Sequence, residues 1–394
     1  MYIERVPPSI CLLVCAGSLL CQSSQGQTTP CDITAEFAST KRLLQTKNYG
    51  GAVAALNRLK ECDSLSPLQL FEIGWLYGRA RHFKEALSVF QSVPDDVPDR
   101  PSHLYAVALS EFELANYKSA VAVLKTLEAE GNLSPESANL LAVSYSKLAL
   151  YEQAQSTLME EIQRHREDQP AYLNLVTLYA DQDRYAEAAK IASDALQVFP
   201  ESAEVLVVRG AANTLIGQLD KAHEDFSNAI RLAPDWADPR FFIALTRYKQ
   251  GKFTDAINSL ELANRRGIAD SDLHYLLAEC LLKLNAANTQ TAMRELNKAV
   301  ELNRSSVSAR VLRGKLLLEA GNTKDAVIDL ERAHQRDPGS RTAAYNLARA
   351  YQKLGKKEDA QLLFEQLRSG KTDVMSELSQ RRLNEVLIQR EAQP

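Results

Sequence analysis

Apolar residues recur at helical spacing along most of the chain, and one stretch shows an unusual form of this pattern. From Arg184 to Pro200 the sequence reads RYAEAAKIASDALQVFP, and the apolar side of the predicted helix consists mainly of alanine. The buried face of an amphipathic helix usually carries larger side chains such as leucine or isoleucine. The stretch therefore predicts a helix that lies unusually close to its neighbour, with Ala188 buried at the contact and Ala186 directed elsewhere.

The same frame recurs along the chain, with an alanine at a fixed place. In most copies an aromatic residue precedes this alanine by three positions, as Tyr185 precedes Ala188. The alanine returns every 34 residues, with one longer step of 36 residues, at Ala52, Ala86, Ala120, Ala154, Ala188, Ala222, Ala256, Ala292, Ala326 and Ala360. A fixed period of this length is the signature of a repeat protein. We therefore predict ten copies of one structural unit, with the extra residues of the longer step looped out after Leu284.

A second position upstream of these alanines, twelve residues earlier in all but the lengthened repeat, is glycine or alanine in eight of the ten copies. If the alanine is the twentieth residue of its repeat, the first repeat begins at Ile33. The eighth places are then Thr40, Gly74, Ala108, Ala142, Val176, Gly210, Ala244, Ala278, Gly314 and Ala348. Larger apolar residues occupy most twenty-fourth places, namely Leu56, Phe90, Leu124, Leu158, Phe226, Leu260, Leu296, Leu330 and Phe364. Antiparallel helices approach closely only where both present small side chains, so the eighth and twentieth places are predicted to meet at a tight crossing.

Helix-ending residues divide the pattern into pairs of helices. Prolines lie near the repeat boundaries, and polar or glycine-containing segments such as LGKKED and AGNTKD interrupt the middle of the repeats. This arrangement resembles the tetratricopeptide repeat, a 34-residue helix–turn–helix with small residues at the eighth and twentieth places. The resemblance covers residues 33–370, and the second repeat matches best, through Leu70, Ile73, Gly74, Tyr77, Phe83, Ala86, Phe90 and Pro98. The family's tryptophan at the fourth place is absent.

The resemblance implies an all-α fold in which ten helix pairs stack into a right-handed α-solenoid, or superhelix. In such arrays each repeat contacts only its neighbours, and a more polar element covers the last apolar face. The segment TDVMSELSQRRLNEVLIQR is predicted to be one further helix. We therefore assign residues 33–370 to the repeats and residues 371–394 to a C-terminal capping helix.

The first residues differ in composition from the repeats. Arg5 is followed by the apolar run ICLLVCAGSLL and then by the polar segment CQSSQGQTTP, which is the layout of a secretory signal. We predict a signal peptide at residues 1–26, cleaved after Gly26, a short segment at residues 27–32 and an exported protein, periplasmic or secreted. Lipid attachment at Cys21 is the alternative, but the bulky Leu20 before it departs from the bacterial lipoprotein pattern.

Export would allow disulfide bonds to form. Cys31 lies just before the first predicted helix and Cys62 lies near the end of its antiparallel partner, so we predict a disulfide between them, with two free thiols as the alternative. Cys280 lies on an apolar helix face and is predicted to be a small core residue.

The sequence shows no motif for catalysis, metal binding or a cofactor. The six histidines are scattered without metal-ligand spacing, and there is no phosphate-binding glycine loop, Gly-x-Ser-x-Gly turn or Cys-x-x-Cys. A net charge of −4 argues against nucleic acid as a partner, and no apolar run is long enough to span a membrane. We therefore predict a non-catalytic protein without a cofactor.

In the family that this chain resembles, the first helix of each repeat lines a concave groove, chiefly through its second, fifth, ninth, twelfth and thirteenth residues. Transferred to this chain, these places predict a partner-binding groove lined by Phe37, Lys41, Phe71, Trp75, Arg79, Tyr105, Leu109, Phe112, Phe241, Tyr248, Lys249, Tyr275, Lys283, Tyr345, Arg349 and Lys353. Aromatic residues beside cations are typical of binding surfaces. Packing between repeats is the alternative role for these aromatic residues. The Lys–Asn pair by which some family members bind the acidic tail of a chaperone is absent.

These observations predict a scaffold that captures an extended or helical peptide, or a protein partner, in its concave groove. The alternative is an accessory factor for envelope assembly or polysaccharide secretion that docks larger subunits through its edges and convex face. The sequence does not identify the partner or indicate whether the protein associates with itself.

Overall fold

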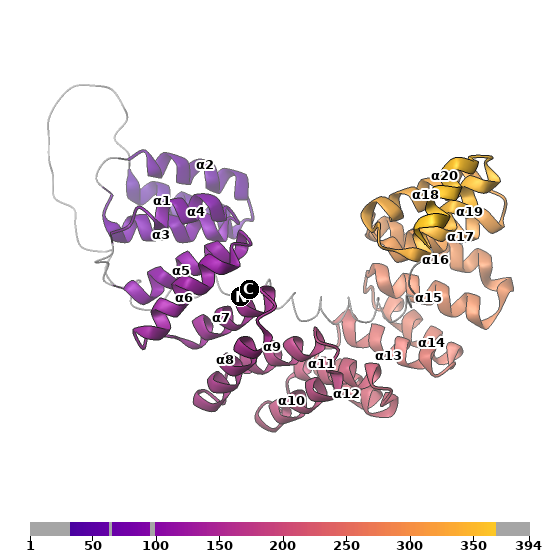
Figure 1. Cartoon of the computed structure of the whole chain (residues 1–394), viewed down its shortest axis with the longest axis horizontal. Coiled ribbons are helices and arrows are strands. Elements are labelled where there is room, and N and C mark those ends of the chain that lie inside the picture. The colour runs from indigo at the N-terminus through magenta and orange to yellow at the C-terminus, as the bar shows by residue number, and fades with distance from the viewer. Residues whose placement is uncertain (1–31, 63–64, 95–98, 368–394) are drawn as a thin grey trace. The chain divides into compact units, whose positions relative to one another are not determined.

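The computed structural model describes residues 32–62, 65–94 and 99–367. Within these ranges the chain forms twenty α-helices and one short 3₁₀ helix, and none of the described residues is in a β-strand (Figure 1). The predicted all-α helical repeat solenoid is therefore confirmed. The described chain divides into two compact units, one ending at Leu178 and the other beginning at Tyr179.

Each repeat contributes two helices, and within each unit these follow one another as antiparallel pairs. The first compact unit contains α1 (Ile33–Gln45), α2 (Tyr49–Lys60), α3 (Pro67–Arg79), α4 (Phe83–Phe90), α5 (Arg100–Glu113), α6 (Tyr117–Ala129), α7 (Pro135–Lys147) and α8 (Tyr151–Arg164). The boundary between the units falls within α9 (Gln169–Ala180). The second unit continues with α10 (Tyr185–Val198), α11 (Ala203–Leu215), α12 (Leu219–Leu232), α13 (Ala237–Lys249), α14 (Phe253–Arg265), α15 (Ser271–Leu284), η1 (Ala286–Asn288), α16 (Thr289–Leu302), α17 (Val307–Glu319), α18 (Thr323–Arg336), α19 (Arg341–Lys353) and α20 (Lys357–Gln366).

Local sequence signals place the helix starts. Nine of the ten first helices begin at the first residue of the predicted repeat, and α5 begins one residue earlier, at Arg100. Side chains before several of these helices accept hydrogen bonds from the first turn; Ser66, for example, forms a reciprocal capping box with Gln69. Such caps satisfy backbone N–H groups that have no partner within the helix.

Each first helix ends in a tight turn at the fifteenth place of its repeat. The residue there has a positive φ angle in nine repeats, and glycine occupies it at Gly217, Gly251, Gly321 and Gly355. In the first five repeats a residue with a side chain adopts the same conformation, at Lys47, Arg81, Ala115, Ala149 and Asp183. Glycine enters this left-handed conformation without the steric cost that a Cβ atom brings.

The small residues of the repeats are buried, as predicted. The ten alanines at the twentieth place are all buried, with Ala188 fully inaccessible while Ala186 is exposed. One detail differs from the prediction: the side chain that covers the eighth place comes mainly from the twenty-fourth. A Cβ atom on Gly210 would lie 2.7 Å from Cε1 of Phe226, sixteen residues later. The glycine is therefore needed because a large side chain packs directly on its backbone.

The lengthened repeat keeps its helix pair. Its extra residues form the 3₁₀ helix η1, which joins α15 to α16, and α15 and α16 contact each other closely. Asn288 holds this turn by donating a hydrogen bond from Nδ2 to the carbonyl oxygen of Leu281, at 3.1 Å. The insertion thus lies in the turn, where the sequence placed it.

Some of the sequence predictions concern residues outside the described ranges. These are the signal peptide at residues 1–26 with its alternative at Cys21, the residues that follow it up to Cys31, and the capping helix at residues 371–394. Cys62 is half-buried and disulfide-bonded. Its predicted pairing with Cys31 stays a prediction, as does export. Cys280 is a free, buried thiol, as predicted. Among the described helices, none has the length and apolar character needed to cross a membrane.

Candidate functional site

The structure divides the predicted groove residues into two groups. Six of them are core residues with at most 8% exposure, namely Phe37, Phe71, Trp75, Leu109, Phe241 and Tyr275. The ring of Phe71 lies 5.7 Å from that of Phe90 in the same repeat and 6.0 Å from that of His103 in the next repeat. For these six residues, which occupy the fifth or ninth place of their repeats, the expected exposure is therefore corrected in favour of packing.

The other predicted groove residues reach the surface in whole or in part. They are Lys41, Arg79, Tyr105, Phe112, Tyr248, Lys249, Lys283, Tyr345, Arg349 and Lys353. Lys41 forms an ion pair with Glu72 of the next repeat, at 2.6 Å. Phe112 packs edge to face on Tyr117, with ring centroids 5.3 Å apart, and Tyr248 packs in the same way on Phe253, at 5.5 Å. These rings are therefore fixed against the turns of their own repeats.

Basic side chains follow the first helices of the last four repeats in the second compact unit. Neighbouring first helices contact one another in the order α13, α15, α17 and α19. We call their cations the basic row, which consists of Lys249, Lys283, Lys315, Arg349 and Lys353. All five occupy the ninth or thirteenth place of a repeat. Lys315 was not among the sequence predictions, although its ninth place in the ninth repeat was a sufficient signal.

Two aromatic residues and two carboxylates accompany the basic row. The guanidinium of Arg349 lies over the ring of Tyr345 at 5.8 Å from its centroid, and Tyr345 is 50% exposed. Burial raises the pKa of Glu279, while Lys283 and Lys315 act in the opposite direction. Glu319 is exposed on α17. The row and its neighbours therefore carry more positive than negative charge. Tyr248 lies on the first helix that carries the row, α13, and Tyr345 lies on the last, α19.

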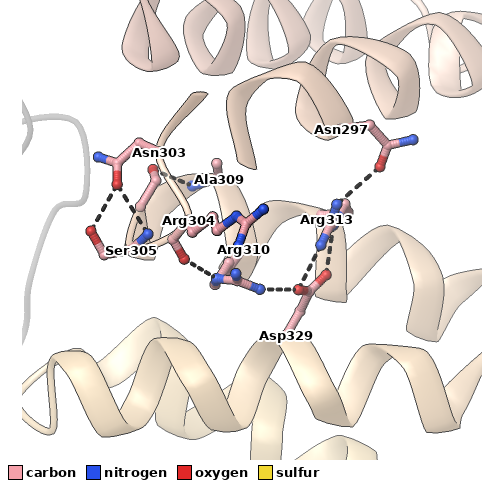
Figure 2. A network of polar contacts seen from close by, with 9 residues as sticks. Asn297, Asn303, Arg304, Ser305, Ala309, Arg310, Arg313 and Asp329 are labelled. Atoms are coloured by element: carbon pink, nitrogen blue, oxygen red, sulfur yellow. Dashed lines mark hydrogen bonds and ion pairs between the residues drawn. The ribbon is translucent and has the colours of Figure 1, made fainter. Parts of the chain in front are cut away.

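A buried polar network joins the two helices of the ninth repeat (Figure 2). Asp329 on α18 accepts hydrogen bonds at Oδ1 from Nη1 of Arg310, at 2.6 Å, and at Oδ2 from Nε of Arg313, also at 2.6 Å. Both arginines are on α17. Arg310 also donates from Nε to the carbonyl oxygen of Arg304, at 2.8 Å, in the turn that joins α16 to α17. The side chains of Arg310 and Asp329 are 5% and 4% exposed.

The turn beside this network is ordered by its own side chains. Oδ1 of Asn303 accepts hydrogen bonds from the backbone N–H of Ser305 at 3.0 Å and from its hydroxyl at 2.7 Å (Figure 2). Ser306 then caps α17 by accepting from the N–H of Ala309. A pocket of about 310 Å³ opens next to the turn, lined by Val300, Glu301, Arg304, Arg310, Arg313 and Arg332. Sequence reasoning missed this arginine pocket because it considered only the groove places.

A related ion pair stands in the sixth repeat. Arg209 donates to Asp225 from Nε at 3.0 Å and from Nη2 at 2.5 Å. Arg209 and Asp225 occupy the seventh and twenty-third places, as Arg313 and Asp329 do in the ninth repeat. Burial raises the pKa of Asp225, and Arg209 opposes that shift. The ion pair therefore joins the two helices of its repeat. The spacing of sixteen residues between the arginine and the aspartate could have been found in the sequence.

Comparison with known families agrees with this repeat geometry. A model of the tetratricopeptide repeat matches residues 173–237, 243–288 and 283–341, and a second model of the same repeat matches residues 317–378. Together these matches cover about half of the chain. The chain belongs to the tetratricopeptide repeat family. Members of this family are generally non-catalytic scaffolds that bind other proteins, and within the described residues no group of three or more histidine, cysteine or acidic side chains is placed to hold a metal ion.

Relatives of this tetratricopeptide repeat protein include proteins named as members of complexes. The chain is 22% identical over 356 residues to the BBSome complex member BBS4 of Bos taurus, covering 82% of this chain and 68% of that protein. It is 20% identical over 307 residues to anaphase-promoting complex subunit 3 of Schizosaccharomyces pombe, covering 76% of this chain and 45% of that protein. The chain thus spans less than half of the second relative.

One solved structure supports the fold. A tetratricopeptide repeat protein from Parabacteroides merdae superposes with a TM-score of 0.52 at 17% identity, covering 64% of this chain and 98% of that one. At this level of identity the likeness concerns the arrangement of helices and not the ligand.

Proposed function

We propose that this protein is a non-catalytic scaffold that binds an acidic, extended segment of a protein partner along the basic row. The observation that carries the proposal is the alignment of Lys249, Lys283, Lys315, Arg349 and Lys353 on the contacting helices α13, α15, α17 and α19. First helices line the concave wall in this family, so the row would form part of a groove. The relatives named as members of the BBSome and of the anaphase-promoting complex support a role in protein binding.

The chemistry of the row suits an acidic segment with apolar side chains. Complementary charge accelerates association and selects against basic partners, while a few aromatic or arginine anchors provide most of the affinity. Tyr345, with Arg349 over its ring, offers such an anchor. An extended chain rises by about 3.3 Å per residue, so a segment of about a dozen residues could cross several neighbouring first helices.

The proposal is tested with charge-reversal variants and a defined peptide. Lys283→Glu combined with Lys315→Glu changes two exposed residues of the row. The probe is a fluorescent twelve-residue peptide that alternates Asp or Glu with Leu or Tyr, measured by fluorescence anisotropy at low and physiological salt. We expect the double variant to bind about tenfold more weakly or worse, because each reversal replaces an attraction with a repulsion. Wild-type affinity should fall as salt increases.

The matched control is Lys221→Glu combined with Lys324→Glu. These lysines are exposed on the second helices α12 and α18, which carry no residue of the row, and the change in net charge is the same. The control should bind nearly as well as the wild type. Equal losses in the two double variants, or equal binding of a peptide with Asn and Gln in place of Asp and Glu, would refute the proposal.

A further inference from the structure

The polar network of the ninth repeat has more buried positive charge than its carboxylate can neutralise. Asp329 accepts from Arg310 and also from both Nε and Nη2 of Arg313, at 2.6 and 2.8 Å. One carboxylate therefore accepts hydrogen bonds from two guanidinium groups and can neutralise only one of the two positive charges. Burial lowers the pKa of Arg310; Asp329 raises it, and Arg332 and Arg313 lower it further. A buried cation without its own counter-charge is costly, and an incoming anion would offset that cost.

In the sixth repeat the corresponding carboxylate is paired with one arginine instead of two, so the positive and negative charges balance. There Asp225 pairs with the single cation Arg209 and accepts a further hydrogen bond from Nδ2 of Asn213. The fourth place of that repeat is Leu206, whereas the ninth repeat has Arg310 there. The second arginine is therefore not needed to join the helix pair.

Two exposed arginines increase the surplus at the mouth of the pocket. Arg304 lies in the turn after α16 and Arg332 lies on α18, and both line the arginine pocket. Neither forms an ion pair within the part of the chain that the structure describes. Four arginines thus face two carboxylates, Glu301 and Asp329, and Asp329 is already engaged by hydrogen bonds.

We propose that the arginine pocket binds a phosphoryl group, as the monoester of a phosphorylated protein segment or of a small phosphorylated molecule. The surplus of two positive charges matches a phosphate monoester, which carries about −1.5 to −2 charges at pH 7. Guanidinium groups bind phosphate oxygens in a bidentate manner, and Nη2 of Arg310 makes no hydrogen bond among the described residues. A single carboxylate would neutralise only half of the surplus.

The arginine pocket is separate from the basic row. Arg310 and Arg313 occupy the fourth and seventh places of the ninth repeat, on α17. Arg332 occupies its twenty-sixth place, on α18, and Arg304 lies in the turn after α16. The row instead uses the ninth and thirteenth places of the repeats. The pocket could therefore act together with the row or without it. This proposal does not rest on the proposed function.

The test measures phosphate binding to the full chain by ³¹P NMR titration at pH 7.5 and low salt. The probes are inorganic phosphate and O-phosphoserine, with malonate as a competing dicarboxylate. The first variant combines Arg304→Gln and Arg332→Gln, which are exposed changes that leave the buried network intact. We expect both phosphate probes to bind it about tenfold more weakly or worse, because charge-assisted contacts are the strong ones. Arg310→Met should abolish binding while Arg313 still pairs with Asp329.

The matched control combines Arg265→Gln and Arg266→Gln on the seventh repeat, where both residues are exposed and neither lines the pocket. It removes the same charge and should bind the probes like the wild type. Circular dichroism confirms that each variant keeps its helices. Absence of phosphate binding by the wild type, equal weakening in the control, or equally tight binding of malonate would each overturn the proposal.

A final comparison identifies the source of the phosphoryl group. A six-residue peptide with one central phosphoserine is titrated beside free O-phosphoserine. Tighter binding of the peptide would support a phosphorylated protein segment, since backbone contacts then add to those of the phosphate. Equal binding would support a small phosphorylated molecule.

Discussion

Gly74 and Phe90 lie so close together that no side chain would fit on the glycine. A Cβ atom added to Gly74 would be 2.4 Å from Cε1 of Phe90, which belongs to the second helix of the same repeat. Gly314 and Leu330 repeat this relationship, with 2.7 Å between the added Cβ and Cγ of the leucine. The eighth and twenty-fourth places of a repeat therefore share one volume. A smaller residue at one place makes room for a larger residue at the other.

The first prediction tests this shared volume. Gly74→Ala should destabilise the first compact unit by about 1–3 kcal/mol, since the ring of Phe90 must move in a packed core. The matched control is Gly78→Ala on the same helix, where an added Cβ has no atom within 4 Å. This control should be neutral or stabilising by up to about 1 kcal/mol, because alanine favours the helix. Urea unfolding of both variants, followed by circular dichroism, gives the comparison.

Combining Gly74→Ala with Phe90→Leu should restore part of the loss. The third and fourth repeats already use this combination, as Ala108 with Leu124 and Ala142 with Leu158, and all four residues are buried. The double variant should therefore be more stable than the sum of the two single changes implies. Strict additivity would show that the two places do not compete for volume.

The second prediction concerns the turn at the fifteenth place. Ala149 has a φ angle of 57° and is exposed. Ala149→Gly should stabilise the protein by about 0.5–1 kcal/mol, because the relief of steric strain exceeds the extra entropy that glycine loses on folding. Gly251→Ala should have the opposite effect, as Gly251 has a φ angle of 73° and open space around it. A loss of stability in Ala149→Gly would contradict this explanation of the turn.

The third prediction concerns the buried ion pair of the sixth repeat. Arg209→Met should cost about 2–3 kcal/mol at pH 7, because Asp225 stays buried without its cation. Burial already raises the pKa of Asp225, and losing Arg209 would raise it further. The protonated acid tolerates burial, so the deficit should shrink as the pH falls through that raised pKa. Thermal unfolding from pH 4 to pH 8 measures the stability deficit of Arg209→Met. Arg231→Met, which replaces an exposed arginine, is the control.

The fourth prediction concerns pH and the eighth repeat. Oε2 of Glu295 lies 2.7 Å from Nδ1 of His274, and this hydrogen bond, with a second from Lys298, lowers the pKa of Glu295 below 4.5 although burial raises it. A carboxylate whose pKa is lowered on folding contributes stability above its unfolded pKa and loses it as the pH falls through the folded value. The stability lost in Glu295→Gln should therefore be complete above pH 4.5, shrink as the pH falls below 4.5, and disappear once the pH is below the lowered pKa of the folded state.

Glu301→Gln is the control for that measurement. Glu301 is exposed on the same helix and makes no ion pair or hydrogen bond among the described residues. Its replacement should change stability little at any pH. A deficit of Glu295→Gln that persists unchanged at pH 3 would show that the contact does not depend on the ionised carboxylate.

The repeat period and the helix boundaries could be predicted from the sequence, because both depend on residues that are close together in the chain. Ala188 and the alanines in phase with it mark a contact that every repeat must make, and caps such as Ser66 start a helix whatever surrounds it. Nine of ten first helices therefore begin where the repeat frame places them. The position of the insertion in the lengthened repeat could also be predicted, because an insertion between two intact helices can only lie in the turn that joins them.

Tertiary structure alone decided which side chains of the first helices are covered. Phe71 and Tyr345 both occupy the fifth place, yet Phe71 is 5% exposed and Tyr345 is 50% exposed. The burial of Phe71 depends on contacts with Phe90 and His103, which come from other helices and so are not encoded in its own helix. The same holds for the arginine pocket: Arg304, Arg310 and Arg332 have separate places in the chain, and only the packing of α17 against α16 and α18 brings their charges together.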